Sequence, residues 1–208
     1  MNRPSLYDLG PGSTFAGRFR VIEKLGQGGM GAVYRVEQTA TGRQRALKVM
    51  HPEFSRDARF RERFAAEALV SARIQSPHAV EVSDAGIDDA TGTPWITMEL
   101  LQGRELNALL ADGRHVPPAE AWAILAQLGD ALAAAHDAGV LHLDLKPANL
   151  FLNDATPGAR TPTLKVLDFG IARVLAEGRT STEVTTAAGS PLWMAPEQTA
   201  SGDRVRAS

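Results

Sequence analysis

HLDLKPAN, residues 142–149, and DFG, residues 168–170, are the two stretches that decide the fold of this chain. Each of them follows a short apolar run. Asp144 offers a carboxylate that can orient and deprotonate a hydroxyl group. Asp168, together with the amide oxygen of Asn149, offers the hard oxygen ligands that Mg²⁺ prefers. The two stretches therefore indicate a catalytic carboxylate next to a metal-binding pair.

The composition describes a chain that can bury a core of its own. It has 208 residues, of which 44% are hydrophobic and 22% are charged, as in soluble globular proteins. The formal net charge of −2 points neither to nucleic acid nor to an anionic membrane. The absence of cysteine excludes disulfides and zinc–thiolate sites and fits a reducing cytoplasm. Neither an apolar run of about 18 residues nor a signal peptide is visible, so we expect a cytoplasmic chain without a membrane segment.

The pattern of apolar residues changes from strand-like to helix-like near residue 102. The expected elements are a strand meander over 19–50, a helix over 57–75, strands near 80–82 and 95–100, and a helix over 118–138. Pro118 suits the first turn of the last helix and Gly139 its C′ position. Its apolar stripe consists of Ala121, Ile124, Leu125, Leu128, Leu132 and Ala135. We expect a lead-in over 1–18, a strand-rich part over 19–101 and a helix-rich part over 102–208.

A glycine-rich segment, GQGGMGAV at 26–33, fits the pattern G-x-G-x-x-G-x-V. Glycines let backbone N–H groups approach phosphate oxygens, since no Cβ stands in the way. The plain alternative is a flexible hairpin tip. The dinucleotide-binding fold also uses such glycines, but there the loop opens a helix. Here a β-branched and aromatic stretch follows, which favours a strand–loop–strand arrangement.

A lysine at position 48 lies inside an apolar strand, where its charge needs a partner. Ala46 and Lys48 share one strand face, and Leu47 lies on the other. One stripe of the helix over 57–75 is formed by Phe60, Phe64, Glu67, Ser71 and Ile74. Glu67 is the expected partner of Lys48, because a carboxylate within an apolar stripe attracts a cation. The alternatives are an edge-strand lysine that reaches water and a solvated glutamate.

Taken in order, the glycine-rich segment, the strand lysine, HLDLKPAN, DFG and APE at 195–197 resemble a eukaryotic-type protein kinase. Gln198 after APE and the compact glycine loop are most similar to bacterial members. The resemblance implies an α+β, bilobal protein-kinase-like fold. Its β-rich N-lobe with the hinge would cover 19–101, and an incomplete helical C-lobe would cover 102–208. The family continues beyond this point with further helices, so we expect the 208 residues alone to be marginally stable and weakly active.

The resemblance also assigns roles to residues. Asp144 would be the base, Lys146 would neutralise charge on the moving phosphoryl group, and Lys48 would hold phosphates. Glu67 would hold Lys48, while Asn149 and Asp168 would bind Mg²⁺ or Mn²⁺. The residues expected to contact ATP are Leu25, Gly26, Gln27, Gly28, Gly29, Met30, Gly31, Val33, Ala46, Lys48, Met98, Glu99, Leu101 and Phe151.

The resemblance fails at one position of the catalytic stretch. Most members carry Arg where this chain has Leu143. That Arg pairs with a phosphate on the activation segment, here 168–197, so we expect phosphorylation not to be a strict on-switch. Plausible autophosphorylation sites in the segment are Thr180, Ser181, Thr182, Thr185 and Thr186. By resemblance, residues 189–191 would receive the substrate, with Ser190 near Asp144.

Three functions compete at this point. The leading one is transfer of the γ-phosphoryl group of ATP to serine or threonine hydroxyls of proteins, including the chain itself. The second is a pseudokinase or truncated nucleotide-binding module that acts through partners. The third, a small-molecule kinase, is disfavoured by the platform over 189–197, which serves extended peptides. We expect protein substrates and no nucleic acid, whereas the pattern leaves dimerisation open.

Overall fold

The computed structural model describes residues 9–51, 54, 58–111, 113, 115–154, 162–169 and 191–199. The chain forms two compact units. The first consists of Met1–Leu69 and Glu81–Leu100, and the second of Val70–Val80 and Leu101–Ser208. Each unit is described by itself below.

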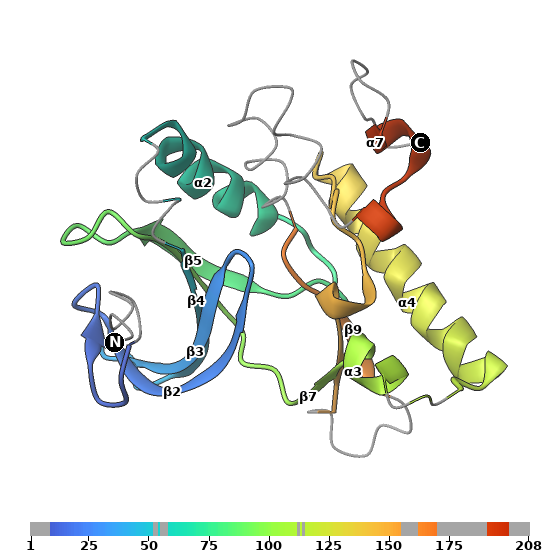
Figure 1. Ribbon diagram of the computed structural model, residues 1–208, viewed down its shortest axis with the longest axis horizontal. Helices are drawn as coiled ribbons and strands as arrows, with labels where there is room; N and C mark the ends of the chain where they lie inside the picture. The colour runs from blue at the N-terminus through green and yellow to red at the C-terminus, as the bar shows by residue number, and fades with distance from the viewer. Residues whose placement is uncertain are drawn as a thin grey trace, which may run out of the picture. The chain divides into compact units, whose positions relative to one another are not determined.

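An antiparallel sheet of six strands dominates the first unit (Figure 1). The strands are β1 (Thr14–Phe15), β2 (Phe19–Gly28), β3 (Gly31–Gln38), β4 (Gln44–Met50), β5 (Val82–Ile87) and β6 (Pro94–Met98). Their order in the sheet is β1-β2-β3-β4-β6-β5. The predicted meander over 19–50 is therefore present as β2, β3 and β4. Gly42 turns the β3–β4 hairpin with a φ of 67°, a conformation that glycine adopts without strain.

The core of the first unit lies on one face of this sheet. Leu47 of β4 and Tyr34 of β3 are fully buried there. Phe19 and Trp95 are buried too, and their rings meet edge to face at 5.1 Å. Val49, two residues after Leu47, belongs to the same cluster, because residues i and i+2 of a strand share a face.

One helix, α2 (Ala58–Ser71), follows β4. Phe60 and Phe64 of the predicted stripe are buried, with ring centroids 5.6 Å apart. The helix ends at Ser71 rather than at 75, because the amide groups of Arg73 and Ile74 donate to Val70 and Ser71 in turns. The second unit begins at Val70, so the end of α2 belongs to it.

Short strands and helices build the second unit. They are β7 (Gly103–Glu105), α3 (Leu106–Ala111), α4 (Pro118–Asp137), η1 (Pro147–Asn149), β8 (Leu150–Asn153), β9 (Thr163–Val166), η2 (Pro191–Trp193) and α7 (Pro196–Thr199). The sheet has the order β7-β8-β9, and α4 packs against β9. The strand expected near 80–82 is divided: Ala79 forms a parallel bridge with Val166 of β9, and β5 starts only at Val82.

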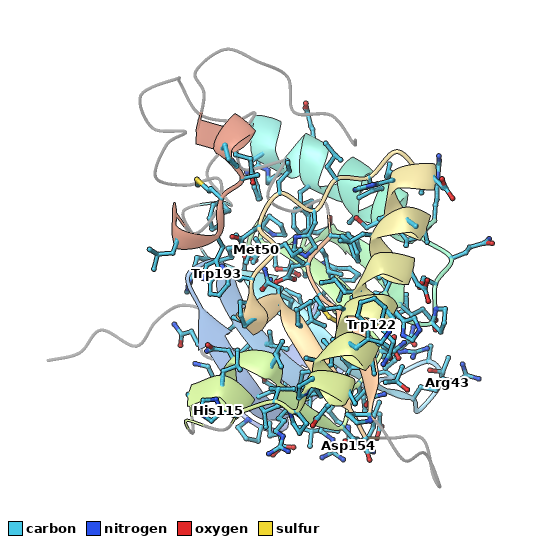
Figure 2. The ribbon with its side chains drawn as sticks, turned by 90° about the vertical axis from the view of Figure 1, so that its right-hand side faces the viewer. Arg43, Met50, His115, Trp122, Asp154 and Trp193 are labelled. Atoms are coloured by element: carbon cyan, nitrogen blue, oxygen red, sulfur yellow. The ribbon has the colours of Figure 1, made fainter. Side chains whose placement is uncertain are left out.

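Helix α4 agrees with its prediction at both ends. Pro118 opens it, and Gly139 follows it with a φ of 74°. The buried stripe is narrower than predicted, because Leu125 is 58% exposed while Ile124 beside it is buried. Trp122, labelled in Figure 2, is also mostly exposed. No helix among the described residues is long and apolar enough to cross a membrane.

Candidate active site

The glycine-rich segment is the hairpin that joins β2 to β3 in the first unit. Gly28 lies opposite Gly31 across the turn. His51, the residue after β4, makes two contacts with this hairpin tip. Its backbone N–H donates to the Met30 carbonyl at 3.0 Å, and its ring Nε2 lies 2.9 Å from the Gly28 carbonyl oxygen. A strand follows the loop, as predicted, and not the helix of a dinucleotide-binding fold. Sequence reasoning did not identify His51.

The glycines of this hairpin differ in their surroundings. A Cβ built on Gly26, Gly28 or Gly29 would meet no atom within 4 Å. A Cβ on Gly31 would overlap the Val49 carbonyl oxygen of β4. Gly31 is therefore required by the sheet itself, whereas the other three leave open backbone to which a ligand can come close.

Lys48 is buried in the middle of β4. It is 7% exposed and lies across from Val33 of β3 and Ile96 of β6. Two residues away, Ala46 lies across from Met98. Residues i and i+2 of a strand share a face, so Ala46 and Lys48 lie on one side of the sheet. Glu67 lies in α2, but its side chain is outside the described part of the structure, and its pairing with Lys48 stays a prediction.

Glu99 and Leu101, two of the residues expected to contact ATP, follow β6. The Glu99 N–H already donates to the Glu81 carbonyl at 3.0 Å, and the Glu99 carboxylate accepts from the Glu81 N–H at 2.9 Å. A contact from the Glu99 backbone to a base would therefore use its carbonyl oxygen. Leu101 and Phe151, both half-buried, belong to the second unit.

Asp144 is the centre of the hydrogen-bond network of the second unit. Its side chain is 7% exposed, and Oδ2 accepts from Lys146 Nζ at 2.7 Å. Asn149 Nδ2 donates to the Asp144 carbonyl at 2.8 Å and to Oδ2 at 3.3 Å. The structure thus brings together three residues that the sequence placed in one stretch. Because the amide nitrogen of Asn149 faces Asp144, its amide oxygen is turned the other way.

His142 supports this network through hydrogen bonds of both its ring nitrogens. Its Nδ1 accepts from the Asp144 N–H at 3.3 Å, so the ring proton lies on Nε2, which donates to the Leu167 carbonyl at 2.9 Å. Burial lowers the pKa of His142, although the bond to Leu167 and the charges of Asp168 and Asp144 act in the opposite direction. The imidazole is therefore neutral. Sequence reasoning assigned His142 no role, although it begins the HLDLKPAN stretch.

Asp168 follows β9 in a left-handed conformation with a φ of 60°. Such a conformation is uncommon for a residue other than glycine and persists only where neighbours enforce it. Here the Leu167 N–H donates to the Asn149 carbonyl at 2.9 Å. Phe169 is buried with its ring edge-on to His142, and its carbonyl accepts from Ser71 Oγ at 2.9 Å. Asp168 is therefore fixed from both sides.

The fit of a divalent cation follows from the chemistry of these donors. The Asp168 carboxylate and the Asn149 amide oxygen are hard oxygen ligands, as Mg²⁺ requires. The described residues contain no group of three His, Cys, Asp or Glu side chains that could hold a metal. Two protein ligands fit Mg²⁺ that is held mainly by substrate phosphates.

Further predictions on the activation segment concern residues outside the described part of the structure. These are the hydroxyls of Thr180, Ser181, Thr182, Thr185 and Thr186, and the platform residues Gly189 and Ser190. The closing stretch is described from Pro191 to Thr199. In it, Gln198 Nε2 donates to the Leu143 carbonyl at 2.8 Å.

Comparisons with known proteins agree with this architecture. The sequence matches the protein kinase domain family over residues 19–207. It is 38% identical over 184 residues to the serine/threonine-protein kinase pkn2 of Myxococcus xanthus, covering 88% of this chain and 21% of that protein. It is 37% identical over 186 residues to the probable serine/threonine-protein kinase PknB of Corynebacterium glutamicum, covering 88% of this chain and 28% of that protein. The chain thus spans less than a third of the length of these curated relatives.

The fold resembles a solved structure, the kinase domain of Mycobacterium tuberculosis PknI. The TM-score is 0.68 at 34% identity, covering 86% of this chain and 73% of that chain. The chain belongs to the protein kinase family. The predicted α+β protein-kinase-like fold is confirmed, as is the likeness to bacterial serine/threonine kinases.

Proposed function

We propose that the protein transfers the γ-phosphoryl group of ATP to serine and threonine hydroxyls of proteins, including its own. The observation that carries the proposal is the buried Asp144 carboxylate with Lys146 and Asn149 on one of its oxygens. These groups are the ones that phosphoryl transfer needs, because positioning and electrostatics dominate its catalysis. Lys146 in this stretch is typical of serine/threonine-directed kinases.

In the proposed reaction Asp144 orients the substrate hydroxyl and takes its proton. The hydroxyl oxygen forms a bond to the γ-phosphorus, the bond from that phosphorus to the β–γ bridging oxygen breaks, and ADP leaves. Lys146 lies within 2.7 Å of Asp144 Oδ2, so its ammonium group is close enough to offset negative charge on the moving phosphoryl group. His142 keeps the Asp144 amide in place throughout.

The nucleotide would be held by the glycine-rich hairpin and by Lys48, with Glu67 as the partner of Lys48. The open backbone at Gly26, Gly28 and Gly29 supports this role. The base would contact the residues named above from Val33 to Phe151, with Met98 behind it. Asn149 and Asp168 would hold Mg²⁺ or Mn²⁺, which neutralises the phosphate charge when bound. We assign residues 19–101 to the N-lobe and 102–208 to part of the C-lobe.

A cytoplasmic location is proposed with this activity, since a chain without cysteine suits a reducing compartment. The competing interpretation, a catalytically inactive nucleotide-binding module, is not favoured. Lys48, Asp144, Asn149 and Asp168 are all present in the expected order.

The experiment is ATP·Mg²⁺ turnover onto a generic basic protein and onto the chain itself, with Asp144→Asn and Lys48→Met beside the wild type. We expect each variant to lose about 100-fold or more in turnover, as for removal of a general base or a phosphate ligand. Asp154→Asn is the matched control, because Asp154 is exposed on the surface of the second unit (Figure 2). If the wild type is active and Asp144→Asn keeps that activity, the proposed role of Asp144 is wrong.

A further inference from the structure

Gln198, the residue after APE, joins the closing stretch over 191–199 to the catalytic loop, residues 142–149. Its Nε2 donates to the Leu143 carbonyl at 2.8 Å, and its Oε1 accepts from the Ala195 N–H at 3.0 Å. The two bonds require the same orientation of the amide, with nitrogen toward a carbonyl and oxygen toward an N–H. Leu143 and Gln198 are 55 positions apart, so the contact is tertiary.

The residue that Gln198 binds is strained. Leu143 has a φ of 61°, in the left-handed region that side chains other than those of glycine, asparagine and aspartate rarely adopt. Backbone strain of this kind persists only where surrounding contacts over-determine it. Leu143 also directly precedes Asp144, so relaxation of its backbone would turn the Asp144 carboxylate.

Both polar atoms of the Leu143–Asp144 peptide group are held by side chains. Its carbonyl accepts from Gln198, and its N–H donates to His142 Nδ1 at 3.3 Å. The next carbonyl, that of Asp144, accepts from Asn149 at 2.8 Å. Of these three side chains, His142 and Asn149 belong to the catalytic loop itself. Gln198 is the one that comes from the closing stretch over 191–199.

We propose that Gln198 is a positioning residue that keeps Leu143 in its left-handed conformation and thereby aims Asp144 at the substrate hydroxyl. The proposal rests on the proposed kinase function. Under this proposal, the Asp144 carboxylate has its catalytic orientation when the closing stretch over 191–199 is bound to Leu143 through Gln198. The closing stretch and the base are thus coupled through one neutral amide.

Three substitutions in the full chain test the donor and the acceptor of the Gln198 amide separately. Gln198→Glu keeps the acceptor for Ala195 but cannot donate to Leu143. Gln198→Lys keeps a donor for Leu143 but cannot accept from Ala195. Gln198→Met has a similar length and neither group. We expect kcat to fall about five- to tenfold in the Glu and Met variants, because both lose the hydrogen bond to the Leu143 carbonyl. The Lys variant should stay within about twofold of the wild type, and KM for ATP should be unchanged in all three.

A role of Gln198 in folding alone would affect the Lys and Met variants alike, and that result would overturn the proposal. So would kcat at the wild-type level in the Glu and Met variants. Hydrogen exchange of the Asp144 amide supplies a readout that does not need turnover. It should be faster in the Glu and Met variants than in the Lys variant, and equal rates in all three would also overturn the proposal. An inactive wild type would contradict the proposed function, and the exchange measurement would still decide the role of Gln198.

Discussion

At the scale of single residues, the arrangement depends on His142, a buried histidine without a charge. Each ring nitrogen has one partner, the Leu167 carbonyl for Nε2 and the Asp144 N–H for Nδ1. Protonation of Nδ1 would turn this acceptor into a donor that faces another donor. The carboxylates of Asp144 and Asp168 favour the charged ring, but desolvation outweighs them. His142 therefore connects Leu167, the residue before DFG, to Asp144 only while its ring is neutral.

We therefore expect His142 to make folding stability sensitive to acid. Its pKa is lowered in the folded state, so the unfolded chain binds the proton first. The stability contribution is fully present above the ordinary value of 6.5 and is lost as the pH falls through the lower folded-state value. The free energy of unfolding of the wild type, from urea titrations, should fall between about pH 7 and about pH 5 more steeply than that of His142→Phe.

The comparison with His142→Phe at about pH 8 isolates the packing and hydrogen-bond cost, since the wild-type histidine is then neutral. We expect about 1–3 kcal/mol there, because the Asp144 N–H and the Leu167 carbonyl lose their partner. Parallel pH curves for the two proteins would show that His142 does not titrate between the folded and unfolded states.

At the scale of elements, β3 and β4 approach each other closely at Gly31. A Cβ there would collide with the Val49 carbonyl oxygen, a backbone atom that cannot swing aside. Gly31→Ala should therefore lower the free energy of unfolding by about 1–3 kcal/mol, as overpacking does. Gly29→Ala is the matched control, since a Cβ on Gly29 meets no atom within 4 Å.

Thermal or urea unfolding measures the stability of both glycine variants, and ATP titration measures their affinity for the nucleotide. We expect Gly29→Ala to leave stability within about 0.5 kcal/mol of the wild type and to weaken ATP binding, because its Cβ stands where phosphate oxygens are proposed to approach. Equal stability of Gly31→Ala and the wild type would mean that β3 and β4 can separate at this position without cost.

The elements that were predicted well are those fixed by local sequence. The β2–β4 meander and α4 follow from alternation, from Gly42 in its turn and from Pro118 and Gly139 at the helix ends. The predictions were wrong where a contact with a distant segment of the chain determines the local structure. Helical spacing runs on to Ile74, but Ser71 bonds to Phe169 and the helix ends there. Ala79 pairs with Val166, so the expected strand near 80–82 is divided.

At the scale of the whole molecule, the candidate site was predictable as far as its residues lie in contiguous motifs. Asp144, Lys146 and Asn149 meet because η1 turns the chain within five positions. The contacts of Gln198 and His51 were missed, because they join separate parts of the sequence through polar groups that leave no periodic pattern. Leu143 was noticed only as a departure from the family. The structure adds that its backbone, rather than its side chain, carries the contact to Gln198.

The last prediction concerns control of the whole kinase by phosphorylation. An activation-segment phosphate strengthens a catalytic loop through a cation, typically Arg, that forms charge-assisted hydrogen bonds with it. Leu143 offers no charge, and its carbonyl is already held by the uncharged amide of Gln198. We therefore expect phosphatase-treated protein to keep at least about a third of the kcat of the phosphorylated form.

Leu143→Arg is the matched variant, because it adds the missing cation at the same backbone position. In it, phosphorylation should raise kcat several-fold more than in the wild type, since each charge-assisted bond contributes about 1.5–3 kcal/mol. Steady-state turnover of the phosphorylated and dephosphorylated forms, with their phosphate content checked by mass, measures both ratios. A wild-type protein that is inert without phosphate and fully active with it would place the phosphate-binding cation elsewhere than at position 143.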